Sequence, residues 1–374
     1  MKNTLTIIFI LLSFINLKAQ TFQGVIKDIE TGEPISQITI VSADQTFFVT
    51  SNDKGEVVLP EAVLNKKVFI NDYEYVYSEK TFTTAQPFVW ELTPNSETLE
   101  EIVIYEDPVK TLDEIIANSI KSFSNNIKLE AYYRENYFEN NQTASFAEGI
   151  VDFYINHNLK DVQMVAKESR IKDFSQTDDI VKTTGAKPQE IVEGSMRFKT
   201  LREIIKDKKK YEFYVTAKQV GDKTIHTCYF GPTEKSKKRF LLKGYFVFDE
   251  TKKLILETNY AFDPEKKKHN KPINIVLAKM DILDVDFSAK YIATERLYYP
   301  SYAKMTFDLI ANSKVAKLNN VRVNNQAYFY VLKTEKTTQN PAESDVYNAG
   351  NLYSRGTIYK TEFWKDPQII NLAE

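Results

Sequence analysis

The sequence predicts a mainly β protein: a small N-terminal β-sandwich followed by a larger antiparallel, curved, half-barrel-like β-domain with one or two packed helices. Three observations support this fold class. From Thr21 to about Tyr105, apolar and polar residues alternate with a period of two, which is typical of strands with one buried face. Aromatic residues make up 13% of the chain, and they suit pleated, half-buried surfaces. One amphipathic helical segment then separates this region from a series of longer alternating strands.

The chain opens with Met1-Lys2-Asn3, continues with an apolar run from Leu5 to Leu17, and reaches a small residue at Ala19. A basic start, a short apolar run and a small residue are typical of a signal peptide, so we assign residues 1–19 to one. An uncleaved anchor is the less favoured alternative, because a transmembrane helix needs about 20 apolar residues. We therefore expect an exported protein of the periplasm or outer membrane, with peripheral membrane association left open.

Residues 20–105 form the predicted sandwich. Its opening stretch, IKDIETGEPISQITI (26–40), reads as two strands joined by the turn Thr31-Gly32-Glu33-Pro34. A second turn, Asn52-Asp53-Lys54-Gly55, joins the next two strands. Asn, Asp and Gly favour such turns because they tolerate positive φ and form local side-chain hydrogen bonds.

These turns carry a resemblance to a known family. Gly24-Val25-Ile26 followed by Asp28, the turn 31–34 with Ile35, and the run Thr50 to Gly55 resemble the carboxypeptidase-like regulatory domain, a transthyretin-like sandwich at the front of many exported proteins. The segment LEEIVIY (99–105) looks like the strand that often leaves this domain. The resemblance implies an accessory module and no peptidase activity.

Residues 106–124 are predicted as the connecting helical segment, with one amphipathic helix over residues 108–124. Asp107 is a candidate N-cap and Pro108 suits the first helical position. The apolar residues that recur at helical spacing are Leu112, Ile115, Ile116, Ile120 and Phe123. A second short helix is expected further on, with Met196, Leu201, Ile204 and Ile205 along one side.

Residues 125–374 are predicted as the antiparallel β-rich domain. The segment AYYRENYFENNQTASFAEGIVDFYI (131–155) and the ending TEFWKDPQIINL (361–372) are similar to an uncharacterised exported family with the same front domain. The predicted architecture also resembles, more loosely, the half-barrel of lipoprotein-localisation factors, whose concave face holds acyl chains. That second resemblance concerns the fold alone.

Composition excludes several classes of function. With 49 basic and 51 acidic residues, the formal charge of −2 gives no global field that points to nucleic acid or to an anionic membrane. The single cysteine, Cys228, cannot form an intramolecular disulfide. No P-loop, G-x-G-x-x-G or G-x-S-x-G motif is present. We predict no cofactor and no nucleic-acid partner.

The histidines do not form a recognisable catalytic or metal motif. His157, His226 and His269 show none of the spacings that zinc peptidases use. His226 and Cys228 would share one strand face. A nucleophilic dyad is conceivable, but a chance meeting of two residues in a sheet is favoured, because activation also needs an orienting third group.

Acidic and basic clusters are read first as solvated surfaces. The pairs Glu100-Glu101 and Asp178-Asp179 are consecutive, so on a strand each pair would point to opposite faces. Asp281, Asp284 and Asp286 lack the glycine and glutamate of a calcium loop, and favour a strand with a wet face. The basic runs 206–210, 235–239 and 266–268 are interpreted as solvated loops, with a phosphate or headgroup contact as the alternative.

Two aromatic patches are the candidate ligand-binding positions. Tyr132, Tyr133 and Arg134 lie in one, and Tyr298 and Tyr299 lie in the other. Such side chains could line a groove for sugar rings or acyl chains, whereas the favoured interpretation places them in the core under the helices. We predict no catalytic and no metal-binding residue.

Together these features predict a non-catalytic cell-envelope protein that binds a protein partner or an amphiphilic, lipid-like or glycan-like ligand. The alternative is a hydrolase acting on glycans or peptides, with a site that no linear motif reveals. A third hypothesis is strand addition between an edge of the front sandwich and an envelope transport protein.

Overall fold

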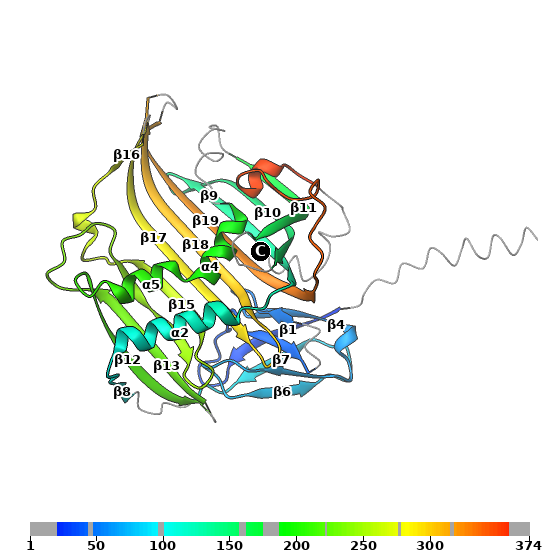
Figure 1. Cartoon of the computed structure of the whole chain (residues 1–374). Helices are drawn as coiled ribbons and strands as arrows, with labels where there is room; N and C mark the ends of the chain where they lie inside the picture. Colours follow the sequence, from blue (N-terminus) through cyan, green and yellow to red (C-terminus); the bar gives the residue numbers. More distant parts are fainter. Residues whose placement is uncertain are drawn as a thin grey trace, which may run out of the picture.

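The computed structural model describes residues 21–43, 48–95, 101–156, 162–174, 187–220, 223–275, 278–314 and 318–358. Several predictions fall outside these ranges: the signal peptide, Glu100, His157, Asp178-Asp179 and the ending 361–372. The structure is mainly β, with a small N-terminal pair of sheets and a large antiparallel sheet that does not close on itself (Figure 1). The predicted fold class is confirmed.

The front module contains two short sheets facing each other across an apolar core. One has the order β4-β1-β7 and the other β3-β2-β5-β6. Trp90, Ile26 and Leu92 are among the fully buried side chains between them. The strands are β1 (Thr21–Asp28), β2 (Thr39–Ser42), β3 (Phe48–Thr50), β4 (Glu56–Pro60), β5 (Lys67–Ile70), β6 (Ser78–Thr81) and β7 (Phe88–Leu92).

The predicted opening hairpin is wrong, because β1 and β2 do not pair and belong to different sheets. The turn after β1 is present, and the Asp28 side chain accepts hydrogen bonds from the backbone N–H groups of Glu30 and Thr31. The second strand begins only at Thr39, and Pro34 forms an isolated bridge with Lys27. Gln37 has a φ of 59° in the intervening segment, and the Ser51 hydroxyl holds this segment by donating to the Ile35 carbonyl and accepting from the Ile38 N–H.

The second predicted turn, Asn52 to Gly55, forms as expected. The side-chain carbonyl oxygen of Asn52 accepts hydrogen bonds from the backbone N–H groups of Lys54 and Glu56. Gly55 has a φ of +73°, and a Cβ there would lie 2.7 Å from the Ile26 carbonyl oxygen. Glycine is therefore required at this position by both conformation and space.

The connecting helix α2 (Pro108–Ser122) confirms the sequence prediction. Asp107 is its N-cap and accepts from the Lys110 N–H at 3.1 Å. Just before it, β8 (Glu101–Val103) pairs with β12 at an edge of the large sheet. The predicted domain boundaries at residues 105 and 124 stay a prediction.

The large sheet has the order β11-β10-β9-β19-β18-β17-β15-β14-β13-β12-β8, with β16 paired to β17, and all its pairs are antiparallel. Its remaining strands are β9 (Ile127–Glu139), β10 (Gln142–Ile155), β11 (Gln163–Asp173), β12 (Tyr211–Val220), β13 (Lys223–Pro232), β14 (Leu242–Asp249), β15 (Leu254–Phe262), β16 (Ile273–Ile275), β17 (Ala278–Ala293), β18 (Tyr298–Ser313) and β19 (Leu318–Lys336).

Three described helices cover one face of this sheet, which we call the helix face (Figure 1). They are α2, α4 (Pro188–Arg197) and α5 (Lys199–Lys206). Their apolar sides and the inward side chains of the sheet form the main core. The predicted second helix is thus two helices, because Phe198 between them has a φ of 47° and breaks the helical path.

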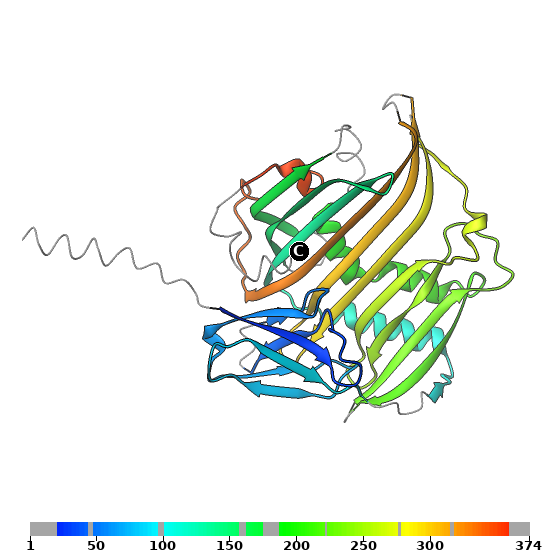
Figure 2. The same ribbon diagram turned by 180° about the vertical axis from the view of Figure 1, so that it is seen from behind.

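The front module packs on the opposite face of the sheet (Figure 2). Tyr330 on β19 points away from the helices, and its hydroxyl lies 3.5 Å from a carboxylate oxygen of Asp53 in the front module. The turn that carries the family resemblance therefore contacts the large sheet directly.

Candidate functional site

A groove of about 1200 Å³ lies at one end of the helix layer. One wall of the groove is α5 and the turn that follows it. The other wall is the segment that leads into β14. Figure 1 shows the C-terminal end of α5 beside β12 at this edge of the molecule. The lining residues are Arg197, Lys199, Thr200, Arg202, Glu203, Ile204, 206–211 and 239–242.

Local hydrogen bonds build the walls of the groove. After α5, the N–H groups of Lys210 and Tyr211 donate to the Asp207 carbonyl, and this turn starts β12. On the other wall, the Leu242 N–H donates to the Tyr211 hydroxyl at 3.3 Å. Phe240 has a φ of 57°, a strained conformation for an aromatic residue, and its N–H donates to the Asn270 side chain at 2.7 Å.

The groove is strongly basic. Eight basic and two acidic residues line it. Asp113 on α2 holds two of the cations, at 2.8 Å from Arg202 and 3.1 Å from Lys206. The hydrogen bond from Arg202 lowers the pKa of the Asp113 carboxyl, which therefore stays ionised at neutral pH.

Three cations of the groove remain available to a ligand. Lys208, Lys209 and Arg239 are exposed, and no ion pair joins them to an acidic side chain in the described part of the chain. Lys210 is instead paired with Asp207 at 2.6 Å. The Arg239 guanidinium lies over the Phe240 ring, 5.6 Å from its centroid. An anion that enters the groove would meet these three cations without breaking an ion pair.

The floor of the groove is apolar. Ile204 and Leu241 are buried, and the half-buried Tyr211 and Leu242 pack against the main core. A groove lined by both apolar side chains and long basic side chains can accept a ligand with an anionic end and a hydrocarbon part. This combination is the chemical character of the site.

The three basic runs seen in the sequence converge at this end. The Thr233 N–H donates to the Lys210 carbonyl at 2.9 Å, which joins the segment before the second run to the first. Lys266 of the third run donates to the Glu234 carbonyl at 2.8 Å. Each run alone is typical of a solvated loop. The sequence therefore showed the basic residues of the site but did not show that they lie close together.

The five predicted ligand-contact residues lie elsewhere, and none of them lines the groove. Tyr133, Tyr298 and Tyr299 belong to the main core on the helix face. The Tyr298 ring stacks on Phe123 with the ring centroids 4.4 Å apart.

Tyr132 and Arg134 point to the opposite face of the sheet. The Tyr132 hydroxyl donates to the buried Glu148 carboxylate, and Arg134 lies 3.3 Å from the same group. These placements give each of the five a packing or polar partner, and their contact with a ligand stays a prediction.

The Cys228 and His226 side chains do not form an activated pair. Burial raises the pKa of the Cys228 thiol well above its ordinary value, which disfavours the nucleophilic thiolate. His226 shares a hydrogen bond of 2.7 Å with the Tyr105 hydroxyl, and burial lowers its pKa. No hydrogen bond joins Cys228 to His226 in the region that the structure describes.

Acidic clusters give no metal site among the described residues. Asp281, Asp284 and Asp286 lie on β17, as predicted for a strand with a wet face, and Asp284 pairs with Lys267 at 2.6 Å. Burial raises the pKa of Asp286.

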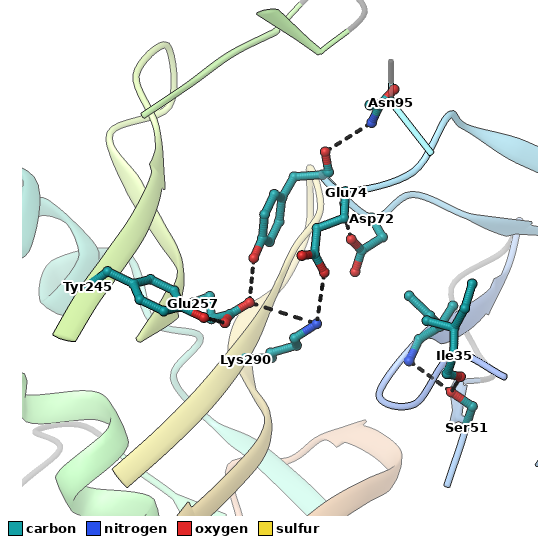
Figure 3. A network of polar contacts seen from close by, with 10 residues as sticks. Ile35, Ser51, Asp72, Glu74, Asn95, Tyr245, Glu257 and Lys290 are labelled. Atoms are coloured by element: carbon teal, nitrogen blue, oxygen red, sulfur yellow. Dashed lines mark hydrogen bonds and ion pairs between the residues drawn. The ribbon is translucent and has the colours of Figure 1, made fainter. Parts of the chain in front are cut away.

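A second polar cluster joins the front module to the large sheet (Figure 3). Lys290 on β17 lies 3.6 Å from Glu74 of the front module and 3.8 Å from Glu257 on β15. Glu257 also accepts hydrogen bonds from the Tyr73 and Tyr245 hydroxyls, at 2.5 and 2.7 Å. Burial alone would lower the pKa of Lys290, but the nearby carboxylates of Asp72, Glu257 and Glu74 raise it overall. The cluster is saturated with internal contacts, so we interpret it as a structural joint.

Comparison with known proteins does not assign a family. No family model and no curated protein match the chain. Among solved structures, lipovitellin is 10% identical with a TM-score of 0.27, over 64% of this chain and 28% of lipovitellin. A LolA superfamily protein from Nitrosomonas europaea is 7% identical with a TM-score of 0.21, over 63% of this chain and 98% of that protein. Likenesses at these TM-scores carry no functional argument.

No helix in the described ranges is long and apolar enough to cross a membrane.

Proposed function

We propose that this protein is an exported, non-catalytic binding protein of the cell envelope that holds an anionic amphiphile in the basic groove. One observation carries the proposal: cations without an ion pair and apolar side chains that belong to the main core line the same groove. The anionic end of the ligand would contact Lys208, Lys209 and Arg239. Its hydrocarbon part would cover Ile204, Leu241 and Leu242.

We further propose that the front module is a carboxypeptidase-like regulatory domain acting as an accessory module. Its two facing sheets and the turn at Gly55 are compatible with the resemblance on which this rests. Its role in this proposal is to pack against one end of the opposite face of the large sheet, away from the groove (Figure 2).

A titration tests the proposed ligand class. The full-length chain is titrated by calorimetry with lysophosphatidylglycerol and with lysophosphatidylcholine of equal chain length, both below their micelle concentrations. We expect tight binding of the anionic lipid, at least tenfold weaker binding of the zwitterionic one, and a comparable loss of anionic-lipid affinity in K208Q/K209Q/R239Q.

A control with the same number of removed charges, K121Q/K172Q/K336Q, alters exposed lysines on α2, β11 and β19 and should keep wild-type affinity. Equal affinity for both lipids, or binding that survives in the groove variant, would contradict the proposal.

A further inference from the structure

We propose that the basic end of this molecule docks onto an anionic bilayer. We define the basic end as residues 206–210, 235–239 and 266–271. The surface extends beyond the groove, because the third run and most of the second do not line it. The proposal rests on the proposed function in one respect only: the bilayer would be the source or the acceptor of the amphiphile.

Charge separation along the chain is the first argument. The basic end holds 12 lysine and arginine residues and a single acid, Asp207. The rest of the chain holds 37 basic and 50 acidic residues, a formal charge of −13. Even with the exposed acids Glu234 and Glu265, which directly flank two of the runs, this surface carries a formal charge of +9, which an anionic membrane attracts and orients.

The availability of these charges is the second argument. Within the described residues, eight of the 12 are exposed and have no ion pair: Lys208, Lys209, Lys235, Lys237, Lys238, Arg239, Lys268 and Lys271. The other four are held by Asp113, Asp207, Glu234 and Asp284. An incoming surface would thus find free cations and would not have to break the pairs that fix the loops.

The loops of the basic end are held as one surface. The Phe240 N–H donates to the Asn270 side chain, and the Asp263 N–H donates to the Leu241 carbonyl at 2.9 Å. With the bond from Thr233 to Lys210, these contacts join all three runs. The charges are therefore presented together by the fold, in contrast to a disordered basic tail.

The chemistry of the surface favours a bilayer over a nucleic acid. Eleven of the 12 cations are lysines, whose flexible stems suit non-specific contact with lipid headgroups. Proteins that bind single-stranded nucleic acid combine basic side chains with exposed aromatic rings, on which the bases stack. Here Tyr211 and Phe240 lie directly beside the runs, and both have internal partners. The Tyr211 hydroxyl accepts from the Leu242 N–H at 3.3 Å, and the Phe240 ring packs on Phe262 with the ring centroids 5.7 Å apart.

Vesicle sedimentation tests the proposal, and the test variant removes charges that lie outside the groove lining. The full-length chain is mixed with phosphatidylcholine vesicles with or without phosphatidylglycerol, at low and high salt. We expect binding only to the anionic vesicles, lost at high salt. Each lysine near an anionic surface contributes about fivefold, so K237Q/K238Q/K268Q/K271Q should bind at least tenfold more weakly. The control K121Q/K172Q/K333Q/K336Q should bind like the wild type.

The outcomes separate this inference from the proposed function. K237Q/K238Q/K268Q/K271Q should keep its affinity for soluble lysophosphatidylglycerol, because its substitutions spare the groove lining. Loss of vesicle binding with retained lysolipid binding supports the docking surface. Equal sedimentation of this variant and its control would overturn it, whatever the groove binds. Binding to single-stranded RNA or polyglutamate in place of vesicles would also overturn it.

Discussion

At the residue scale, Glu135 on β9 is the most constrained acid of the helix face. It is fully buried and accepts four hydrogen bonds, from the Tyr133 and Tyr137 hydroxyls and from the N–H groups of Leu352 and Tyr353. This carboxylate therefore helps to hold the C-terminal segment over the sheet, together with the backbone hydrogen bonds that Ser169 and Ile358 exchange. Burial raises its pKa to about 7 from an ordinary value of 4.5.

This raised pKa predicts a pH-dependent stability. Between about pH 4.5 and pH 7 the folded state binds more protons at Glu135 than the unfolded state does, so its contribution to stability is lost as the pH rises. Relative to E135Q, the free energy of unfolding of the wild type should fall by about 3 kcal/mol over this range, since one pKa unit corresponds to about 1.4 kcal/mol. Urea unfolding of both proteins at several pH values measures it. A difference that is constant or rises with pH would contradict the assignment.

Cys228 gives a second residue-scale prediction. Because its thiol is buried and its pKa is raised, a thiol reagent should not label it in the native protein, and labelling should follow unfolding in urea. The native H226A variant should be labelled as slowly as the native wild type, apart from any increase that follows from a loss of stability. Rapid labelling of the native wild type, slowed in H226A, would revive the dyad and the hydrolase alternative.

At the element scale, the contact between α2 and α5 controls the charge of the groove. Asp113 on α2 neutralises Arg202 and Lys206 on α5 without lining the groove itself. D113N keeps the shape of the side chain and removes its charge. We expect this variant to bind an anionic lysolipid roughly twofold to fivefold more tightly, because two lining cations lose their partner.

Calorimetric titration measures this change, and the expected gain should shrink at high salt. D345N, which removes an exposed acid outside the groove lining, is the control with unchanged affinity. If D113N unfolds like the wild type but binds the lysolipid more weakly, the prediction is wrong. Asp113 would then position the basic side chains of the groove, and its effect on their charge would not limit binding.

At the scale of the whole molecule, Lys290 joins the front module to the large sheet. Replacing it by methionine would leave the Glu74 and Glu257 carboxylates close together without their cation. We expect K290M to lower the free energy of unfolding by about 2–3 kcal/mol, and K290R to recover part of the loss. Thermal unfolding with limited proteolysis measures both. Unchanged melting of K290M would show that other contacts hold the module.

Local patterns allowed much of this architecture to be predicted. The capping signals at Asp107 and Pro108 and the apolar spacing predicted α2 with an error of two residues at its end. Alternation predicted the strands, because period two follows from the direction of side chains on a strand. It did not predict their pairing, since β1 and β2 lie in different sheets. The break at Phe198 was missed, since an aromatic residue with positive φ leaves no sequence signal of its own.

The candidate site could be predicted only in part. The three basic runs were visible, but their meeting depends on the pairing of β12, β13, β14 and β15 and on contacts such as Thr233 to Lys210. Long-range pairing of this kind is not encoded in any single segment. The aromatic patches drew attention because of their density, whereas adjacent residues such as Tyr132 and Tyr133 face opposite sides of the sheet.

The central claim is that the basic groove holds an anionic amphiphile, and native mass spectrometry with lipid extraction tests it most directly. The wild-type protein and K208Q/K209Q/R239Q are purified from their own envelope and compared. We expect one anionic amphiphile bound to each wild-type chain and none bound to the variant. An empty wild-type mass, or the same adduct retained by the variant, would contradict the claim.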